Sequence, residues 1–174
     1  MDYKKLGRLF SKYEAEKIDT HGGSIRIFVK KNSKTKIEKS VKLLLNEEEE
    51  FGIKNYKTYL EFAKKVYKIR DNVRKNILKL KENNAKIIGY GSPAKATTAL
   101  NFFGISKEIE YIVEDNKLKH GKFLPGMKIP IVSKSHIKDK PDYALVLAWN
   151  FINEIERKNV DLVNKFISIK DLEN

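Results

Sequence analysis

The residues best suited to chemistry lie in the segment GYGSPAK, which runs from Gly89 to Lys95. Gly89 and Gly91 permit a tight turn that brings backbone N–H groups close to a ligand. A helix start is expected next, because Ser92 is a good N-cap and Pro93 suits the first helical position. Unpaired N–H groups and the helix dipole favour an anion at such a start. We therefore expect this turn, with Lys95 one helical turn further on, to receive phosphate or another polar group.

A second candidate is Asp115, which follows the apolar run EYIVE and is itself followed by Asn116. In a nucleotide-binding βαβ unit, an acidic residue at the tip of the second strand accepts hydrogen bonds from ribose hydroxyls. The glycine pattern is close to the dinucleotide fingerprint, with Ala94 at the third small position. Two plainer interpretations remain open. The glycines only make a tight turn, and Asp115 is an ordinary loop residue.

Two further segments complete the expected site. The loop 117–127 would lie over the carboxyl ends of the strands, where ligands bind in open α/β sheets. Trp149 and Asn150 follow a fully apolar run and would form the opposite wall, while Lys95 and Glu154 would pair with each other in a purely structural interpretation. No catalytic or metal-binding residue is assigned. The expected substrate-binding residues are Gly89, Tyr90, Gly91, Ser92, Pro93, Lys95, Asp115, Asn116, Lys119, Lys122, Pro125, Gly126, Trp149 and Asn150.

The order of the elements that would position these residues predicts an α/β fold, a small Rossmann-like, doubly wound and mostly parallel sheet over residues 84–174. A short apolar run precedes the glycine turn, and Gly104 is placed to end the helix that follows it. The expected strands are 85–89, 110–114, 129–132, 143–148 and 166–169, with helices over 92–104 and 151–159.

The first half of the chain is expected to be mainly helical. Residues 36–50 and about 55–81 carry apolar side chains at the three-and-four spacing of amphipathic helices. We expect the segment 32–83 to pack on the sheet, with the aromatic stripe of the longer helix in the core. Residues 1–31 predict a helix and a β-hairpin, which cannot form a core alone. The expected helix carries Leu6, Leu9, Phe10 and Tyr13.

Composition limits the class of protein. The chain has 174 residues and no cysteine, and its three histidines are too scattered to suggest a metal cluster. It contains no run of roughly 18 apolar residues and no signal-peptide core, so we expect a soluble, cytoplasmic protein that does not enter a membrane. The net charge of +13 invites a nucleic-acid interpretation. Because the lysines are spread over the whole chain and no recognition module is present, we favour a phosphorylated small molecule instead.

Four segments together resemble the C-terminal domain of the sugar C-methyltransferase family. They are HGGSIRIFV, IIGYGSPAKATTALNFFGI, EYIVEDNKLKHGKFLPGMKIPI and PDYALVLAWNFINEI. They occur in the family's order and cover nearly the whole chain. The residues that fall on family positions are Gly89, Gly91, Pro93, Lys95, Asp115, Lys119, Gly121, Pro125, Gly126, Trp149, Asn150 and Glu154.

The resemblance implies a three-part enzyme with a small zinc-binding domain, a central S-adenosylmethionine (SAM) domain and a Rossmann-like C-terminal domain that holds a nucleotide-linked deoxysugar. Methylation would occur at a sugar carbon next to a keto group. This chain has no cysteine set for zinc, no glycine-rich SAM loop and no catalytic tyrosine-histidine-glutamate-histidine motif. Residues 1–31 would then be the end of the SAM domain. This chain would bind no cofactor itself, with SAM implied for the complete enzyme.

The first functional hypothesis is therefore a sugar-nucleotide-binding domain in deoxysugar biosynthesis, acting with a separate SAM-binding methyltransferase chain or as part of a split enzyme. The alternative is an NAD(P)-type dinucleotide-binding oxidoreductase domain. That alternative needs a hydride-transfer pair, such as a Tyr-Lys or His-Asp set, which the second half of the sequence does not show. A basic nucleic-acid or assembly module is a third and weaker hypothesis.

Overall fold

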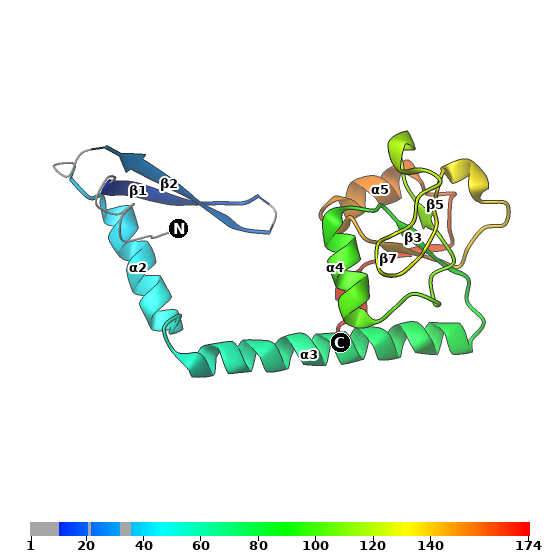
Figure 1. Ribbon diagram of the computed structural model, residues 1–174, viewed down its shortest axis with the longest axis horizontal. Coiled ribbons are helices and arrows are strands. Elements are labelled where there is room, and N and C mark those ends of the chain that lie inside the picture. Colours follow the sequence, from blue (N-terminus) through cyan, green and yellow to red (C-terminus); the bar gives the residue numbers. More distant parts are fainter. Residues whose placement is uncertain (1–10, 21, 32–35) are drawn as a thin grey trace. The chain divides into compact units, whose positions relative to one another are not determined.

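The computed structural model describes residues 11–20, 22–31 and 36–174. The chain divides into two compact units, one ending at Ala63 and the other comprising Lys64–Asn174 (Figure 1). This division falls inside a long helix, so it does not coincide with the boundaries expected after residues 31 and 83. Each unit is described by itself.

The first unit contains a β-hairpin and a helix. Strands β1 (Ser11–Ile18) and β2 (Ser24–Lys30) pair antiparallel, and their connection includes Gly22 and Gly23, both with positive φ. Helix α2 (Lys39–Phe51) contacts β1 and ends at Gly52, whose left-handed conformation closes the helix.

The helix expected near the N-terminus is wrong at Tyr13, which lies in β1. Pairing with β2 extends as far as Ser11 opposite Lys30, so hydrogen bonds between the strands override the helical spacing of the side chains. The other residues of that expected helix, Leu6, Leu9 and Phe10, lie outside the described residues.

Helix α3 (Tyr56–Glu82) has two different halves. Val73 and Ile77 near its C-terminus are fully buried. Tyr56 and Tyr59 near its N-terminus are exposed, so the aromatic stripe expected in the core does not lie there. The spacing of apolar residues alone does not show which part of a helix packs against the core. Within the part of the chain that the structure describes, no helix is both long enough and apolar enough to cross a bilayer.

The second unit is built on a five-stranded parallel sheet with the strand order β5-β4-β3-β6-β7. The first strand of the unit is thus central. The next two strands along the chain lie on one side of it, and the last two lie on the other. This order is the Rossmann arrangement and confirms the expected fold class. The strands are β3 (Ile87–Tyr90), β4 (Ile112–Val113), β5 (Ile131–Val132), β6 (Tyr143–Val146) and β7 (Lys165–Ile167).

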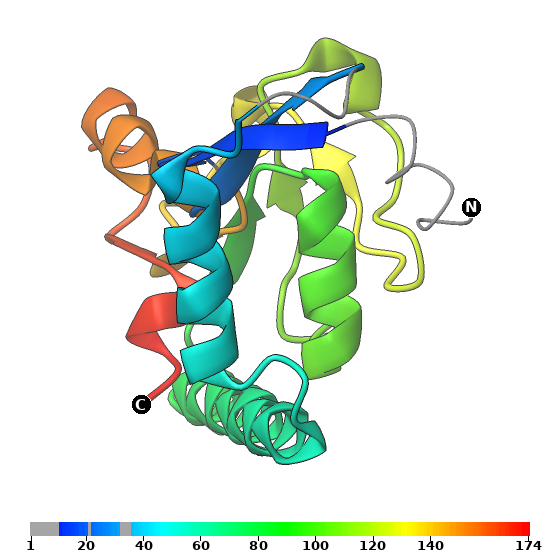
Figure 2. The same cartoon turned by 90° about the vertical axis from the view of Figure 1, so that its left-hand side faces the viewer.

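Successive side chains of each strand point to opposite faces of this sheet, as the pleat requires. One face carries Ile87, Ile112 and Leu145, which pack with α4 (Ala94–Phe103) and the C-terminal half of α3. The other face carries Ile88 and its neighbours, which pack with α5 (Ile152–Lys158). The two faces can be followed in Figure 2, where α4 is green and α5 is orange.

The burial in α3 predicts the effect of a single substitution. Ile77→Ala removes a fully buried side chain, so it should lower the free energy of unfolding of the second unit by about 2–5 kcal/mol. The neighbouring Leu78 is 40% exposed, and Leu78→Ala should cost about 1 kcal/mol or less. Urea denaturation followed by the fluorescence of Trp149, the only tryptophan, measures both. Equal losses in the two variants would contradict the placement of α3.

Candidate functional site

A cavity of about 240 Å³ lies at the carboxyl ends of the strands, where the strand order reverses between β3 and β6. The chain leaves β3 toward one face of the sheet and leaves β6 toward the other, so the two connections diverge there. Ligands bind at such switch points in open α/β sheets. The cavity is lined by Tyr90, Gly91, Glu114, Asp115, Ala148, Phe151, Glu154, Ile155, Lys158 and Asn159.

The two glycines of the GYG pattern have different roles. Gly91 forms the turn, with φ of 82°, and a Cβ there would lie 3.0 Å from that of Ala148. The expectation that Gly89 also shapes the turn is wrong. Gly89 lies inside β3, where a Cβ would lie 2.8 Å from Cγ1 of Ile112, so this glycine allows side chains to pack across the strand.

The helix after the turn begins one residue later than expected. Pro93 is the N-cap, in an extended conformation, and α4 starts at Ala94. Ser92 does not cap the helix, because its hydroxyl donates to the Glu114 carboxylate at 2.5 Å. A charged acceptor competes successfully for this hydroxyl, since hydrogen bonds to ionised groups are stronger than neutral ones.

Glu114 is the central polar residue of the site. Its side chain is only 12% exposed and accepts hydrogen bonds from the Ser92 amide at 2.9 Å and the Asn116 amide at 3.1 Å. Lys119 Nζ donates to it at 3.2 Å and also donates to the Ser92 carbonyl at 3.0 Å. Burial alone would raise the pKa of the Glu114 carboxyl, but hydrogen bonds from Ser92, Asn116 and Lys119 outweigh burial and lower the pKa to about 2.

Glu114 is not among the binding residues expected from the sequence, although the strand pattern contains a signal for it. Side chains alternate along a strand, so Glu114 continues the face of Ile112 rather than that of Val113. The Ile112 face is the one that α4 covers. A carboxylate at that position points toward the turn that starts α4. Asp115 fits the expected position of an acidic residue at a strand tip, so Glu114 beside it was not singled out.

Asp115 lies at the tip of β4 in a second cluster. Its carboxylate accepts from the Tyr90 hydroxyl at 3.1 Å and pairs with Lys134 Nζ at 2.9 Å. Burial raises the pKa of Tyr90, so its hydroxyl stays protonated. The side-chain oxygen Oδ1 of Asn116 accepts a hydrogen bond from the Leu118 backbone amide at 3.0 Å.

Lys95 and Trp149 are brought together by the fold. Lys95 Nζ lies 4.2 Å from the centre of the Trp149 ring, a cation–π distance. Trp149 and the exposed Asn150 belong to a short 3-10 helix that is separated from the end of β6 by two residues. The alternative pairing of Lys95 with Glu154 is wrong, because Glu154 pairs with Lys158 one turn along α5.

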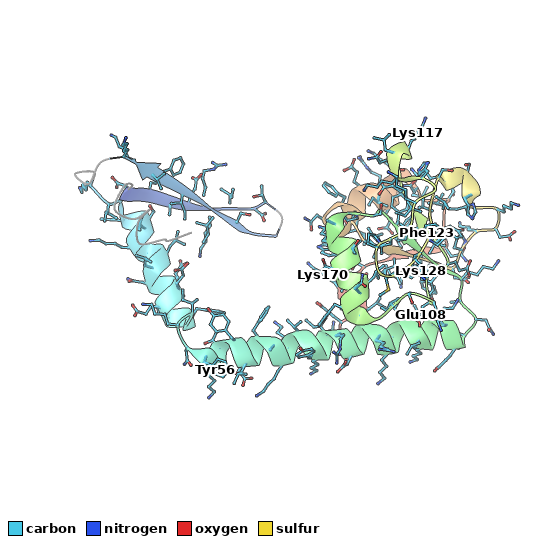
Figure 3. The ribbon with its side chains drawn as sticks, viewed as in Figure 1. Tyr56, Glu108, Lys117, Phe123, Lys128 and Lys170 are labelled. Carbon is cyan, nitrogen blue, oxygen red and sulfur yellow. The ribbon has the colours of Figure 1, made fainter. Side chains whose placement is uncertain are left out.

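The expected loop residues divide into two groups. Lys119 joins the Glu114 cluster, but Lys122 lines a separate hollow of about 420 Å³ with His120 and His136. The Pro125-Gly126 turn lies elsewhere again, where the Asn101 side chain near the end of α4 donates to the Pro125 carbonyl at 3.1 Å. Figure 3 labels Lys117, Phe123 and Lys128, which mark the course of this loop.

The second unit is a Rossmann-like domain with a cavity at its switch point, and the comparisons with known proteins specify its family. The model of the C-methyltransferase C-terminal domain matches residues 19–168. C-methyltransferase NovU from Streptomyces niveus is 34% identical over 164 residues, which cover 88% of this chain and 39% of NovU. The chain therefore belongs to the C-methyltransferase C-terminal domain family. It spans about two-fifths of the length of this relative, and neither comparison supports the oxidoreductase alternative.

The low pKa of Glu114 predicts a pH-dependent contribution to stability. A carboxyl whose pKa falls from 4.5 to about 2 on folding stabilises the folded state above about pH 5, by at most about 3 kcal/mol. This contribution is lost as the pH falls toward 2. The difference in free energy of unfolding between wild type and Glu114→Gln should therefore narrow from pH 7 to pH 3 in urea titrations.

Glu156→Gln is the matched control, because Glu156 is an exposed carboxylate on α5. Its difference from wild type should stay constant within about 0.5 kcal/mol over the same range. A Glu114→Gln difference that does not change with pH would show that the carboxylate is not stabilised by folding.

Proposed function

We propose that this chain is the sugar-nucleotide-binding domain of a SAM-dependent sugar C-methyltransferase. The observation that carries the proposal is the cavity at the switch point of a Rossmann-like sheet, in a chain of the C-methyltransferase C-terminal domain family. The carboxylates of Glu114, Asp115 and Glu154 line this cavity, which suits a ligand that offers hydroxyl groups. The ligand class proposed is a nucleotide-linked deoxysugar.

The residues around the cavity suggest how such a ligand would be held. The Asp115 side chain is 63% exposed, and its carboxylate has acceptor capacity beyond the Tyr90 and Lys134 contacts, so it would accept from sugar or ribose hydroxyls. Lys95 would attract the diphosphate. Its neighbour Trp149 would offer an aromatic face to a ring of the ligand.

The methyl-transfer step is assigned to a methyltransferase partner, either a separate chain or the other part of a split enzyme. SAM would supply the methyl group there. The glycine turn of this chain does not suit SAM, since the Gly91 and Ser92 amides are already hydrogen-bonded and proline has no N–H. This domain would bind and orient the sugar nucleotide.

The first unit offers a surface for that partner. Ile25, Ile27 and Val29 lie on one face of β2 and are each about half exposed, although Ile25 and Ile27 also line a hollow shared with α2. Exposed apolar surface of this kind marks protein contacts. About three-fifths of NovU lies outside the region that matches this chain. We therefore propose that the hairpin is the end of a methyltransferase domain and contacts the rest of it.

Ligand binding predicts a thermal shift. A nucleoside-diphosphate deoxysugar at a hundred times its Kd should stabilise the folded chain by about 2.7 kcal/mol and raise Tm by about 5–10 °C. SAM and NAD(H) should leave Tm unchanged. Differential scanning fluorimetry with a panel of nucleoside-diphosphate sugars measures this, and a shift with NAD(H) alone would contradict the proposal.

Asp115→Asn should raise the Kd of the nucleotide sugar about tenfold, because a neutral amide is a poorer acceptor for ligand hydroxyls than a carboxylate. Isothermal titration calorimetry gives the Kd values. The matched control is Asp139→Asn, since Asp139 pairs with Lys86 and does not line the cavity. Equal affinities of the wild type and Asp115→Asn for the nucleotide sugar would show that Asp115 does not contact the ligand.

A further inference from the structure

We propose that Glu114 acts as a built-in anion that fills the phosphate position of the Gly91–Ser92 turn, so that this turn accepts uncharged hydroxyl groups and excludes phosphate. The inference deepens the proposed function and rests on it for the class of ligand. It concerns which part of a nucleotide sugar can lie at the turn.

The first argument is that the turn has no amide left for a phosphate. The Gly91 amide donates to the Val113 carbonyl at 2.8 Å, and the Ser92 amide donates to Glu114. Pro93 has no amide N–H at all. Three successive positions that would otherwise form an anion-binding turn are therefore occupied or lack a donor. The Ser92 hydroxyl, a fourth possible donor, is also bonded to Glu114.

The charged groups that line the cavity also disfavour phosphate. Three carboxylates line it, those of Glu114, Asp115 and Glu154. The nearby cations are already paired, Lys134 with Asp115 and Lys158 with Glu154. Each of the three carboxylates is paired with a lysine, so a phosphate entering the cavity would find no unpaired cation among its lining residues. A sugar hydroxyl would instead find acceptors.

The third argument is that Glu114 is held firmly in place. Lys119 contacts both the Glu114 carboxylate and the Ser92 carbonyl, and so joins the two partners. The His120 ring contacts the Glu114 carbonyl through Nε2 at 2.7 Å. An incoming phosphate would have to displace a carboxylate with several hydrogen bonds, two of them from the same serine.

The arrangement orients the ligand. The sugar ring would lie in the cavity against Asp115, and the diphosphate would lie outside the turn. Lys95 is the cation suited to receive the diphosphate, because its charged group lies over Trp149 instead of against a carboxylate. The expectation that the glycine turn itself receives phosphate is thus replaced by a division between a hydroxyl site and a phosphate site.

The test uses inorganic pyrophosphate, which contains no sugar, with the full chain labelled with ¹⁵N. In the wild type, millimolar pyrophosphate should shift the Lys95 resonances more than the Ser92 amide resonance, because the Ser92 amide stays bonded to Glu114. In Glu114→Ala and Glu114→Gln the vacated or neutralised position should bind pyrophosphate about tenfold or more tightly than wild type, with a shift at Ser92. Glu156→Gln, which removes one exposed carboxylate, should behave as wild type.

A wild-type shift of the Ser92 amide larger than that of Lys95 would overturn the inference. So would two folded Glu114 variants that gain no affinity for pyrophosphate. Glu114→Gln keeps the side-chain shape and covers the case in which Glu114→Ala does not fold, and the wild-type titration stands without either variant. Because none of these measurements uses a sugar nucleotide, their failure is distinguishable from failure of the proposed function, which the thermal-shift panel tests separately.

Discussion

The hydrogen bonds between Ser92 and the Glu114 carboxylate connect the ends of the central strand β3 and its neighbour β4, where the cavity lies. Ser92 lies in the connection from β3 to α4, and Glu114 directly follows β4. One buried carboxylate therefore fixes the turn, the helix start and the strand tip relative to one another. Because Asp115 follows Glu114 directly, its position beside Tyr90 depends on the same interaction.

Much of this fold follows from sequence patterns. Short apolar runs, a glycine turn and the alternation of strands and helices suffice for a parallel Rossmann-like sheet, and Gly104 ends α4 in the left-handed conformation as expected. The helical spacing of apolar residues is misleading at Tyr13, where strand pairing decides the structure. The aromatic residues of α3 show a related limit, since amphipathic spacing does not reveal where along a helix the core ends.

The site was less predictable than the fold, and for a physical reason. Motif positions correctly brought Gly91, Asp115 and Trp149 to the carboxyl ends of the strands. They did not indicate which acceptor each hydrogen-bond donor of the site would bond to. Whether Ser92 caps a helix or binds a carboxylate depends on a residue from a neighbouring strand, and the Pro125-Gly126 turn lies against α4 because of its contact with Asn101. Such choices are made by tertiary contacts that no local pattern encodes.

The most direct test of the account is a crystal structure of this chain with a bound nucleoside-diphosphate deoxysugar. The account predicts a sugar ring in the cavity with a hydroxyl on Asp115, a diphosphate near Lys95 and an unbroken contact between Ser92 and Glu114. A diphosphate bonded to the Ser92 amide would contradict the role of Glu114. A ligand bound away from the carboxyl ends of β3 and β6 would contradict the site itself.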